Sequence, residues 1–244
     1  MTTGQAYVLN PAVVEALVRR LELLPQLLRR QQEEEITALV PFNADWLHQQ
    51  QTDLLADQSL AAFLEARNWD LHDLELHLRR PDALKRFAHQ RFGPGLEERF
   101  LASKGSRDQV IYSLLRVRDP GLARELWIRL EEGETTFAEA ASSHSDGPEA
   151  QRKGVMGPVP IGHLQPPQLV DWLRSLRPGE IRRPEPLGEW HVLVRLEQLS
   201  PARFDAGMRD LLLQEELDKF LEQRVQQLIA GELLEPLYYD SSHE

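Results

Sequence analysis

Residues 190–196 read Trp-His-Val-Leu-Val-Arg-Leu, and this alternation is the clearest structural signal in the chain. Successive side chains of an extended strand point to opposite faces, so the pattern separates into two sets. One face receives Trp190, Val192, Val194 and Leu196, and the other receives His191, Leu193 and Arg195. The pattern therefore predicts a strand over residues 189–199.

A second strand is predicted at residues 110–117, which are rich in β-branched and aliphatic side chains. Between the two strands, helical spacing alternates with short extended or polar stretches. The sequence predicts helices at 120–130, 137–142 and 166–176, a polar loop at 143–153 and an irregular short strand at 154–160. Residues 105–200 are thus predicted to form a small unit with both helices and strands, and the boundary before it lies at Lys104-Gly105-Ser106.

Helical sequence lies on both sides of this unit. Apolar residues recur at spacings of three and four before residue 104, and the predicted helices cover 11–24, 26–40, 44–56, 59–67, 70–80, 81–92 and 95–103. A long amphipathic helix is predicted over residues 205–229. Its apolar stripe consists of Leu213, Leu217, Phe220, Leu221, Val225 and Leu228. A single helix cannot bury such a stripe alone, so we expect it to pack on the N-terminal helices.

The composition excludes several classes of protein. The 244 residues carry a net charge of −11, which repels a phosphate backbone, so we expect no nucleic-acid partner. The chain has no cysteine, which rules out a disulfide framework and a thiolate nucleophile. No apolar run is long enough to span a membrane, and the first residues lack a signal-peptide pattern. We therefore expect a cytoplasmic protein without membrane insertion.

Metal and cofactor chemistry fit the sequence poorly. His72 and His77 are five residues apart, which places them on different faces of a helix, whereas a zinc-binding pair needs a spacing of four. No phosphate-binding loop, dinucleotide-binding glycine pattern or serine nucleophile elbow is present. We expect no metal and no cofactor.

Four short motifs in the predicted α/β unit resemble the parvulin family of peptidyl-prolyl isomerases. They occur in the family's order, as Ser113-Leu114-Leu115-Arg116, Lys153-Gly154-Val155-Met156-Gly157, Leu176-Arg177-Pro178-Gly179-Glu180-Ile181 and Glu189-Trp190-His191-Val192-Leu193-Val194. The resemblance implies a small antiparallel sheet wrapped by helices. Together with the flanking helices it resembles the layout of SurA/PrsA-type chaperone foldases.

The expected fold class is therefore α+β. A parvulin-like small antiparallel sheet with helices is inserted in an all-α domain made from the N- and C-terminal segments. The expected parts are an N-terminal helical, chaperone-like domain over residues 1–104, a parvulin-like domain over 105–200, and a C-terminal helix over 201–244 that packs on the N-terminal domain.

The resemblance also implies where a site would lie. The family forms a polar cluster from two histidines, a cysteine or aspartate, and a serine or threonine. In this sequence the last-strand histidine is His191, the first-strand histidine position holds Ser113, and the cysteine or aspartate position falls on Gly147 beside Asp146. The serine or threonine position falls near Leu187 or Gly188. The position of the family's glycine two residues before the histidine holds Glu189, and the neighbouring Gly188 allows a one-residue shift.

The candidate site residues follow from this match. His191, Ser113 and Asp146 are the catalytic candidates, and Met156, Leu164 and Leu169 are the candidates for binding the peptide. Each also has an ordinary interpretation as a strand, turn or core residue. Because most of the family's polar cluster is changed, the resemblance leaves catalysis open.

Isomerisation of an X-Pro bond requires passage over a barrier of about 18–20 kcal/mol that is set by amide resonance, and it needs no nucleophile or metal. The expected function is a peptidyl-prolyl cis-trans isomerase or chaperone that binds extended, proline-containing segments of unfolded polypeptide clients. The alternatives are a non-catalytic parvulin-fold binding module and an accessory subunit in peptide maturation or export. In either case the leucine-rich helices could hold a protein partner.

Overall fold

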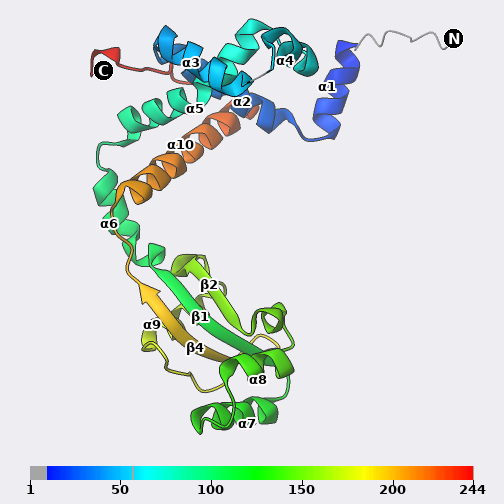
Figure 1. Cartoon of the computed structure of the whole chain (residues 1–244), viewed down its shortest axis with the longest axis vertical. Helices are drawn as coiled ribbons and strands as arrows, with labels where there is room; N and C mark the ends of the chain where they lie inside the picture. The colour runs from blue at the N-terminus through cyan, green and yellow to red at the C-terminus, as the bar shows by residue number, and fades with distance from the viewer. Residues whose placement is uncertain (1–9, 57, 244) are drawn as a thin grey trace, which may run out of the picture. The chain divides into compact units, whose positions relative to one another are not determined.

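The computed structural model describes residues 10–56 and 58–243 (Figure 1). The chain divides into two compact units, and its two ends belong to the same one. The helical unit contains the residues up to Leu96 and those from Ala206 on, and the sheet unit contains Glu97–Asp205. This architecture confirms the predicted α+β fold, in which a unit with a sheet is inserted in a helical one.

The helical unit is built around the C-terminal helix. Its helices are α1 (Pro11–Arg20), α2 (Leu24–Leu39), α3 (Ala44–Leu55), α4 (Leu60–Arg67), α5 (Leu71–Phe92) and α10 (Ala206–Ile229). Helix α10 packs against α2 and α5, as the apolar stripe predicts. The buried apolar residues of α10 are Leu212, Leu213, Leu217, Leu221 and Val225.

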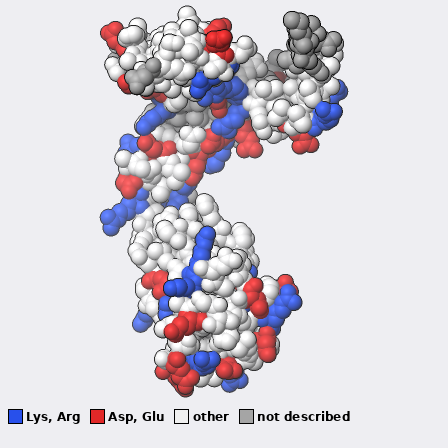
Figure 2. Space-filling model, turned by 45° about the vertical axis from the view of Figure 1, so that its right-hand side comes forward, with Lys and Arg blue, Asp and Glu red and all other residues white. Residues whose placement is uncertain are grey.

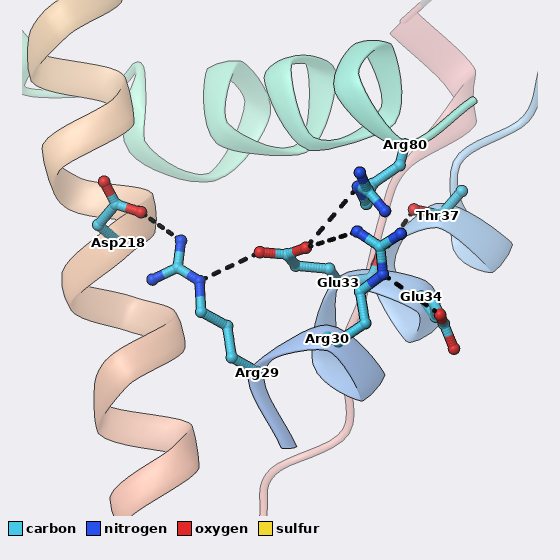
Figure 3. A network of polar contacts seen from close by, with 7 residues as sticks. All are labelled: Arg29, Arg30, Glu33, Glu34, Thr37, Arg80 and Asp218. Carbon is cyan, nitrogen blue, oxygen red and sulfur yellow. Dashed lines mark hydrogen bonds and ion pairs between the residues drawn. The ribbon is translucent and has the colours of Figure 1, made fainter. Parts of the chain in front are cut away.

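A polar network joins the same three helices (Figure 3). Glu33 on α2 accepts a hydrogen bond from Arg29 at 3.1 Å and forms a 3.8 Å ion pair with Arg80 of α5. The Arg29 guanidinium also donates to Asp218 of α10. This hydrogen bond is the main reason that the pKa of Arg29 is raised. The N-terminal and C-terminal segments are therefore held together by charges as well as by apolar packing.

Helix α5 differs from the prediction. The sequence predicts two helices that meet at Pro81, but the structure has one helix from Leu71 to Phe92 with Pro81 inside it. A capping box between Asp70 and Asp73 begins the helix. Its buried residues lie on both sides of the proline: Leu74, Ala83, Phe87 and Ala88. Packing along this whole face outweighs the lost backbone hydrogen bond, which a proline inside a helix costs together with steric strain.

The sheet unit contains an antiparallel sheet of four strands in the order β2-β1-β4-β3. The strands are β1 (Gln109–Val117), β2 (Val155–Pro160), β3 (Glu185–Leu187) and β4 (Trp190–Ser200). The helices are α6 (Leu96–Arg107), α7 (Pro120–Glu131), α8 (Phe137–His144) and α9 (Pro167–Ser175), with short 3-10 helices η1 (Pro148–Arg152) and η2 (Ile161–His163). The structure ends with η3 (Ser241–His243).

The two faces of the sheet carry separate apolar clusters, which we call the α9 face and the α7/α8 face. The α9 face contains Val110, Tyr112, Leu114, Val192, Val194 and Leu196, packed against Ile161, Leu169, Trp172 and Leu173. The α7/α8 face contains Leu115, Val117 and Leu193, packed against Ala123, Leu126, Leu130, Phe137, Ala140 and Ala141. The alternation predicted for residues 190–196 is confirmed by this division.

Three local features differ from the sequence expectations. The Lys104-Gly105-Ser106 stretch lies inside α6, and the division into units falls at 96/97 and 205/206. The polar segment 143–153 contains η1, and the three-residue strand β3 was not predicted. Both elements are short, so their sequences contain too few residues to establish a periodicity.

Charged side chains of both signs are mixed on the surface (Figure 2). On the face shown in Figure 2, Lys and Arg side chains lie among Asp and Glu side chains. None of the helices in the described part of the chain combines the length and apolar character that crossing a membrane requires.

Candidate functional site

A buried ion pair lies where the loop after α8 meets the sheet. Arg116 comes from β1 and Glu149 from η1. The guanidinium donates two parallel hydrogen bonds to the carboxylate, Nε to Oε1 at 2.8 Å and Nη2 to Oε2 at 2.7 Å. Glu149 is only 1% exposed, whereas the Arg116 side chain is 28% exposed. This bidentate geometry fixes the plane of the guanidinium.

The loop itself completes the arrangement. The Ser145 hydroxyl donates to Oε1 of Glu149 at 2.6 Å and accepts from the backbone N–H of Arg116 at 3.0 Å. The next amide, that of Asp146, donates to the carbonyl oxygen of Arg116 at 2.9 Å. Both oxygens of the buried carboxylate are therefore hydrogen-bonded, and the loop is attached to β1 through both backbone groups of Arg116.

The ion pair shifts the acidity of both partners. Burial alone raises the pKa of the Glu149 carboxyl, but hydrogen bonds from Arg116 and Ser145 outweigh burial and hold the pKa below its usual value. The hydrogen bonds to Glu149 raise the pKa of Arg116. Burial raises the pKa of the Tyr112 hydroxyl on the same strand. Near neutral pH the site therefore contains a charged carboxylate, a charged guanidinium and a neutral phenol.

Gly147 has no room for a side chain at this point. A Cβ atom on Gly147 would lie 2.3 Å from Oε2 of Glu149 and 2.4 Å from Nε of Arg116. The family resemblance places a cysteine or aspartate at this position. In this protein the Arg116–Glu149 ion pair occupies the space that such a side chain would need.

The guanidinium keeps one nitrogen for another partner. Arg116 uses Nε and Nη2 for Glu149, and Nη1 makes no hydrogen bond to any residue in the described ranges. Strand alternation places Arg116 beside Val192, on the α9 face. The site thus offers one oriented donor close to an apolar cluster.

Ser113 lies on the opposite face and has a partner of its own. It is buried, and its hydroxyl donates to the carboxylate of Glu197. Glu197 also accepts a 2.8 Å hydrogen bond from Arg195, and the Arg195 guanidinium lies 5.2 Å from the centre of the Phe137 ring. These contacts link Ser113 to the packing against α8.

His191 does not meet Ser113. Ser113 pairs with Arg195 and Val117 pairs with His191, so the two side chains are separated by four residues along the strands, about 13 Å. Strand alternation places His191 on the α7/α8 face, together with Leu193. The expectation that both side chains contribute to one cluster is corrected by this register.

The other predicted residues divide in the same way. Asp146 is exposed on the loop and contributes its backbone amide to the site. Leu169 is buried in the α9-face cluster, and Met156 and Leu164 pack against that cluster. The three peptide-binding candidates therefore lie together on the α9 face, whereas His191 and Ser113 belong to the other face.

Sequence reasoning did not identify Arg116, Ser145 and Glu149 as a site. Arg116 and Glu149 are 33 residues apart, and no local spacing connects them. The available signal was the glycine at position 147, followed two residues later by an acidic residue. A glycine where the family resemblance has a polar side chain, with an acidic residue close by in the same loop, indicates that the acidic residue takes the place of that side chain.

Comparison with known proteins bears on this unit. Residues 121–198 match the PPIC-type PPIase domain family, also called rotamase. This span contains α7, α8, β2, α9, β3 and most of β4, together with the loop that carries Glu149. No curated protein matches the sequence.

Several solved structures are similar to the chain at low sequence identity. The peptidyl-prolyl isomerase PrsA of Bacillus anthracis is 17% identical, with 86% of this chain and 100% of that chain covered and a TM-score of 0.49. PrsA of Bacillus cereus is 14% identical, with coverages of 97% and 93% and a TM-score of 0.48. A structure from the study of the SurA-like chaperones PEB4 and Cj1289 of Campylobacter jejuni is 16% identical, with coverages of 94% and 88% and a TM-score of 0.37.

Proposed function

We propose that this chain, in which residues 121–198 form a PPIC-type peptidyl-prolyl isomerase domain, is an isomerase- and chaperone-type protein that binds extended, proline-containing polypeptide. The observation that carries the proposal is the family match over the unit that contains the α9-face cluster. Unfolded or partly folded proteins are the clients that suit such a domain, because their X-Pro bonds are accessible.

The α9 face supplies the apolar part of the proposed site. Met156 and Leu164 are partly exposed beside a fully packed core, so they can contact a proline ring without disturbing the fold. Leu169 supports them from within the core. Holding the ring in a site with little water favours the twisted amide, whose resonance is reduced, over the planar one.

Arg116 supplies the polar part of the proposal. A donor that is fixed before the substrate binds can hydrogen-bond the prolyl nitrogen, whose lone pair becomes available as the amide twists and its resonance is reduced. Glu149 fixes the guanidinium through two hydrogen bonds and leaves Nη1 for this nitrogen of the substrate. In this proposal His191 and Ser113 have structural roles, because both lie on the α7/α8 face.

The alternative is a binding module that retains the fold without catalysis. One observation motivates it: the ion pair fills the space of the family's cysteine or aspartate at Gly147. The two functions share the peptide-binding surface and differ in whether the rate of isomerisation is raised.

An exchange measurement separates them. The cis–trans exchange rate of a short Ala-Pro peptide would be measured by NMR for the wild type and for Arg116→Met and His191→Ala. We expect the wild type to exceed the uncatalysed rate, Arg116→Met to lose roughly tenfold or more of that excess, and His191→Ala to change it less than twofold. A wild-type rate equal to the uncatalysed one, with chemical-shift changes on peptide binding at Met156 and Leu164, would establish the binding module instead.

Titration with peptides, followed by NMR chemical shifts, tests the binding site itself. A peptide without proline should bind the α9 face more weakly than its proline counterpart. If neither peptide shifts resonances of the α9 face, the proposal fails in both forms. A cytoplasmic location remains a prediction, and fractionation of cells that produce the protein at its native level would test it.

A further inference from the structure

Tyr112 lies on the α9 face, directly opposite a residue of the proposed peptide site. It pairs with Met156 of β2 on one side and with Leu196 of β4 on the other. Directly opposed residues of an antiparallel pair have Cβ atoms about 4.5–5.5 Å apart and share one face. All three side chains belong to the α9-face cluster, in which Leu196 is buried and Met156 is half-buried. The phenol ring of Tyr112 therefore lies beside the side chain that we propose contacts the proline ring.

The sheet is irregular at this position. Strand β4 has one extra residue opposite the step from Ile111 to Tyr112, because these two residues pair with Gln198 and Leu196. Strand β2 likewise has one extra residue between the partners of Val110 and Tyr112. Bulges redirect the side chains around them and are frequent beside active sites. Tyr112 thus lies where the sheet departs from regular pairing on both sides.

The hydroxyl of Tyr112 is available as a donor. The residue is only 4% exposed, and its hydroxyl makes no hydrogen bond to any residue that the structure describes. A fully enclosed polar atom without a partner is costly, and within the described ranges such side-chain atoms are Nε of Arg79, Nη1 of Arg80, Nε1 of Trp127 and Nε of Arg182. The phenol oxygen is not one of them, so the small exposed part of Tyr112 includes its hydroxyl.

The phenol is also close enough to the ion pair to be influenced by its charges. Burial is the main cause of the raised pKa of Tyr112, while the charge of Arg116 lowers this pKa and the charge of Glu149 raises it. The phenol therefore stays protonated, and able to donate, well above neutral pH. Along β1 the buried Leu114 separates Tyr112 from Arg116 on the same face. The polar side of the site thus contains the Tyr112 hydroxyl as well as Nη1 of Arg116.

We infer that the Tyr112 hydroxyl donates a hydrogen bond to the carbonyl oxygen of the substrate proline. This role rests on the proposed function, because it requires a proline ring against Met156. The prolyl nitrogen is the partner of Arg116 in that proposal. The carbonyl oxygen of the residue before proline changes position as the bond rotates, so a fixed donor cannot hold it in both isomers. The carbonyl group of the proline itself is attached to the ring and can accept the same hydrogen bond throughout.

Such a hydrogen bond acts on binding and not on the maximal rate. It is present in the cis isomer, in the trans isomer and in the twisted state, so it strengthens the binding of all three equally. Loss of an interaction of this kind weakens substrate binding and leaves the rate at saturation unchanged. Arg116 differs, because its nitrogen partner becomes an acceptor only as the amide twists. Substitution of Tyr112 and substitution of Arg116 should therefore affect different kinetic constants.

Two small ligands that differ in one carbonyl group test the inference. Acetyl-alanyl-proline methylamide contains the proline carbonyl, and acetyl-alanyl-pyrrolidine has the ring without it. Both would be titrated by NMR into the wild type, Tyr112→Phe and the control Tyr238→Phe, which loses a hydroxyl from a residue that is 69% exposed in the helical unit. We expect Tyr112→Phe to bind the methylamide about threefold to tenfold more weakly than the wild type and the pyrrolidine compound equally well.

The exchange rate and the control complete the expected result. At saturating methylamide, the cis–trans exchange rate of Tyr112→Phe should differ less than twofold from that of the wild type. Tyr238→Phe should match the wild type with both ligands. Equal affinity of Tyr112→Phe and the wild type for the methylamide would overturn the inference and leave the proposed function intact. Equal weakening for both ligands would also overturn it, because the hydroxyl would then support only the packing.

Two further outcomes are distinguishable. If the wild type binds neither ligand on the α9 face, the proposed function fails and the role of Tyr112 fails with it. If circular dichroism shows that Tyr112→Phe does not fold, the Cζ resonance of Tyr112 in the wild type replaces the variant, because it responds to hydrogen bonding of the hydroxyl. It should move further with the methylamide than with the pyrrolidine compound, and an equal response to both ligands would overturn the inference.

Discussion

At the scale of single residues, the sheet unit departs from the family pattern by the exchange of one polar side chain for an ion pair. A glycine stands where the family resemblance places a polar side chain, and a bidentate ion pair from two other positions occupies the space. The individual motifs could be matched from the sequence, but the exchange could not, because it joins Arg116 on a strand to Glu149 in a distant loop. Contacts of this kind are decided by tertiary packing rather than by local pattern.

Restoring a side chain at position 147 should destabilise the protein. Gly147→Ala places a methyl group within 2.4 Å of the ion pair, and relief of that overlap requires Arg116 or Glu149 to move. We expect a loss of about 1–3 kcal/mol in the free energy of unfolding, measured by urea denaturation. Gly105→Ala is the matched control, because its new methyl group would meet Arg174 only at 3.7 Å. Equal stabilities for the two variants would contradict the described geometry.

The ion pair should also make stability depend on pH. The folded pKa of Glu149 is lower than its unfolded value, so its contribution is complete above the unfolded pKa and disappears as pH falls through the folded one. With an ordinary glutamate pKa of about 4.3 in the unfolded chain, we expect the difference between wild type and Glu149→Gln to be full above about pH 5 and to shrink as pH falls through the lower pKa of the folded state. Urea denaturation at each pH measures this, with Glu131→Gln, an exposed residue of α7, as control. A constant difference down to pH 3 would exclude the effect.

At the scale of elements, the long periodic segments were predictable and the short or interrupted ones were not. The alternation at residues 190–196 identified β4 and both of its faces, and the leucine stripe identified α10. Pro81 misled the prediction of α5, because a local rule about proline competed with burial along the whole helix. The three residues of β3 become a strand only because β4 provides its partner.

Replacement of the proline inside α5 should stabilise the helical unit. Pro81→Ala restores one backbone N–H within the helix and removes a ring from its interior, for a gain of up to about 3 kcal/mol. Pro120→Ala is the control, since Pro120 is in the first turn of α7, where proline is tolerated. Thermal unfolding should show a higher midpoint for the first variant and little change for the second. A lower midpoint for Pro81→Ala would mean that the packing requires the ring.

At the scale of the whole molecule, the C-terminal helix completes a unit that the first third of the chain begins. This was predictable, because an amphipathic helix with a wide apolar stripe needs a partner. The boundaries were harder to predict, because the chain continues as helix α6 through the turn-like Lys104-Gly105-Ser106. At residues 104–106 the linker-like composition indicated a domain boundary more strongly than the helical spacing indicated a helix.

Loss of packing on α10 should affect the helical unit first. Leu217→Ala removes a fully buried side chain between α10 and its neighbours, which we expect to cost about 2–5 kcal/mol. Hydrogen exchange should then accelerate in α2, α5 and α10 and change little in β1 and β4. Leu211→Ala, at an exposed position of the same helix, should leave exchange unchanged. Equal acceleration in the sheet would show that the two units unfold as one.

The insertion of one unit inside the other has a consequence for synthesis on the ribosome. About 110 residues separate the end of α5 from the start of α10, and translation at about 5–20 residues per second takes on the order of ten seconds to cover them. During that delay the apolar faces of α2 and α5 have emerged while the helix that covers them has not been made. The sheet unit can fold in this interval. The nascent chain should then carry a folded sheet unit and an incomplete helical unit. The exposed apolar faces of α2 and α5 should make this nascent chain prone to aggregation until α10 has been made.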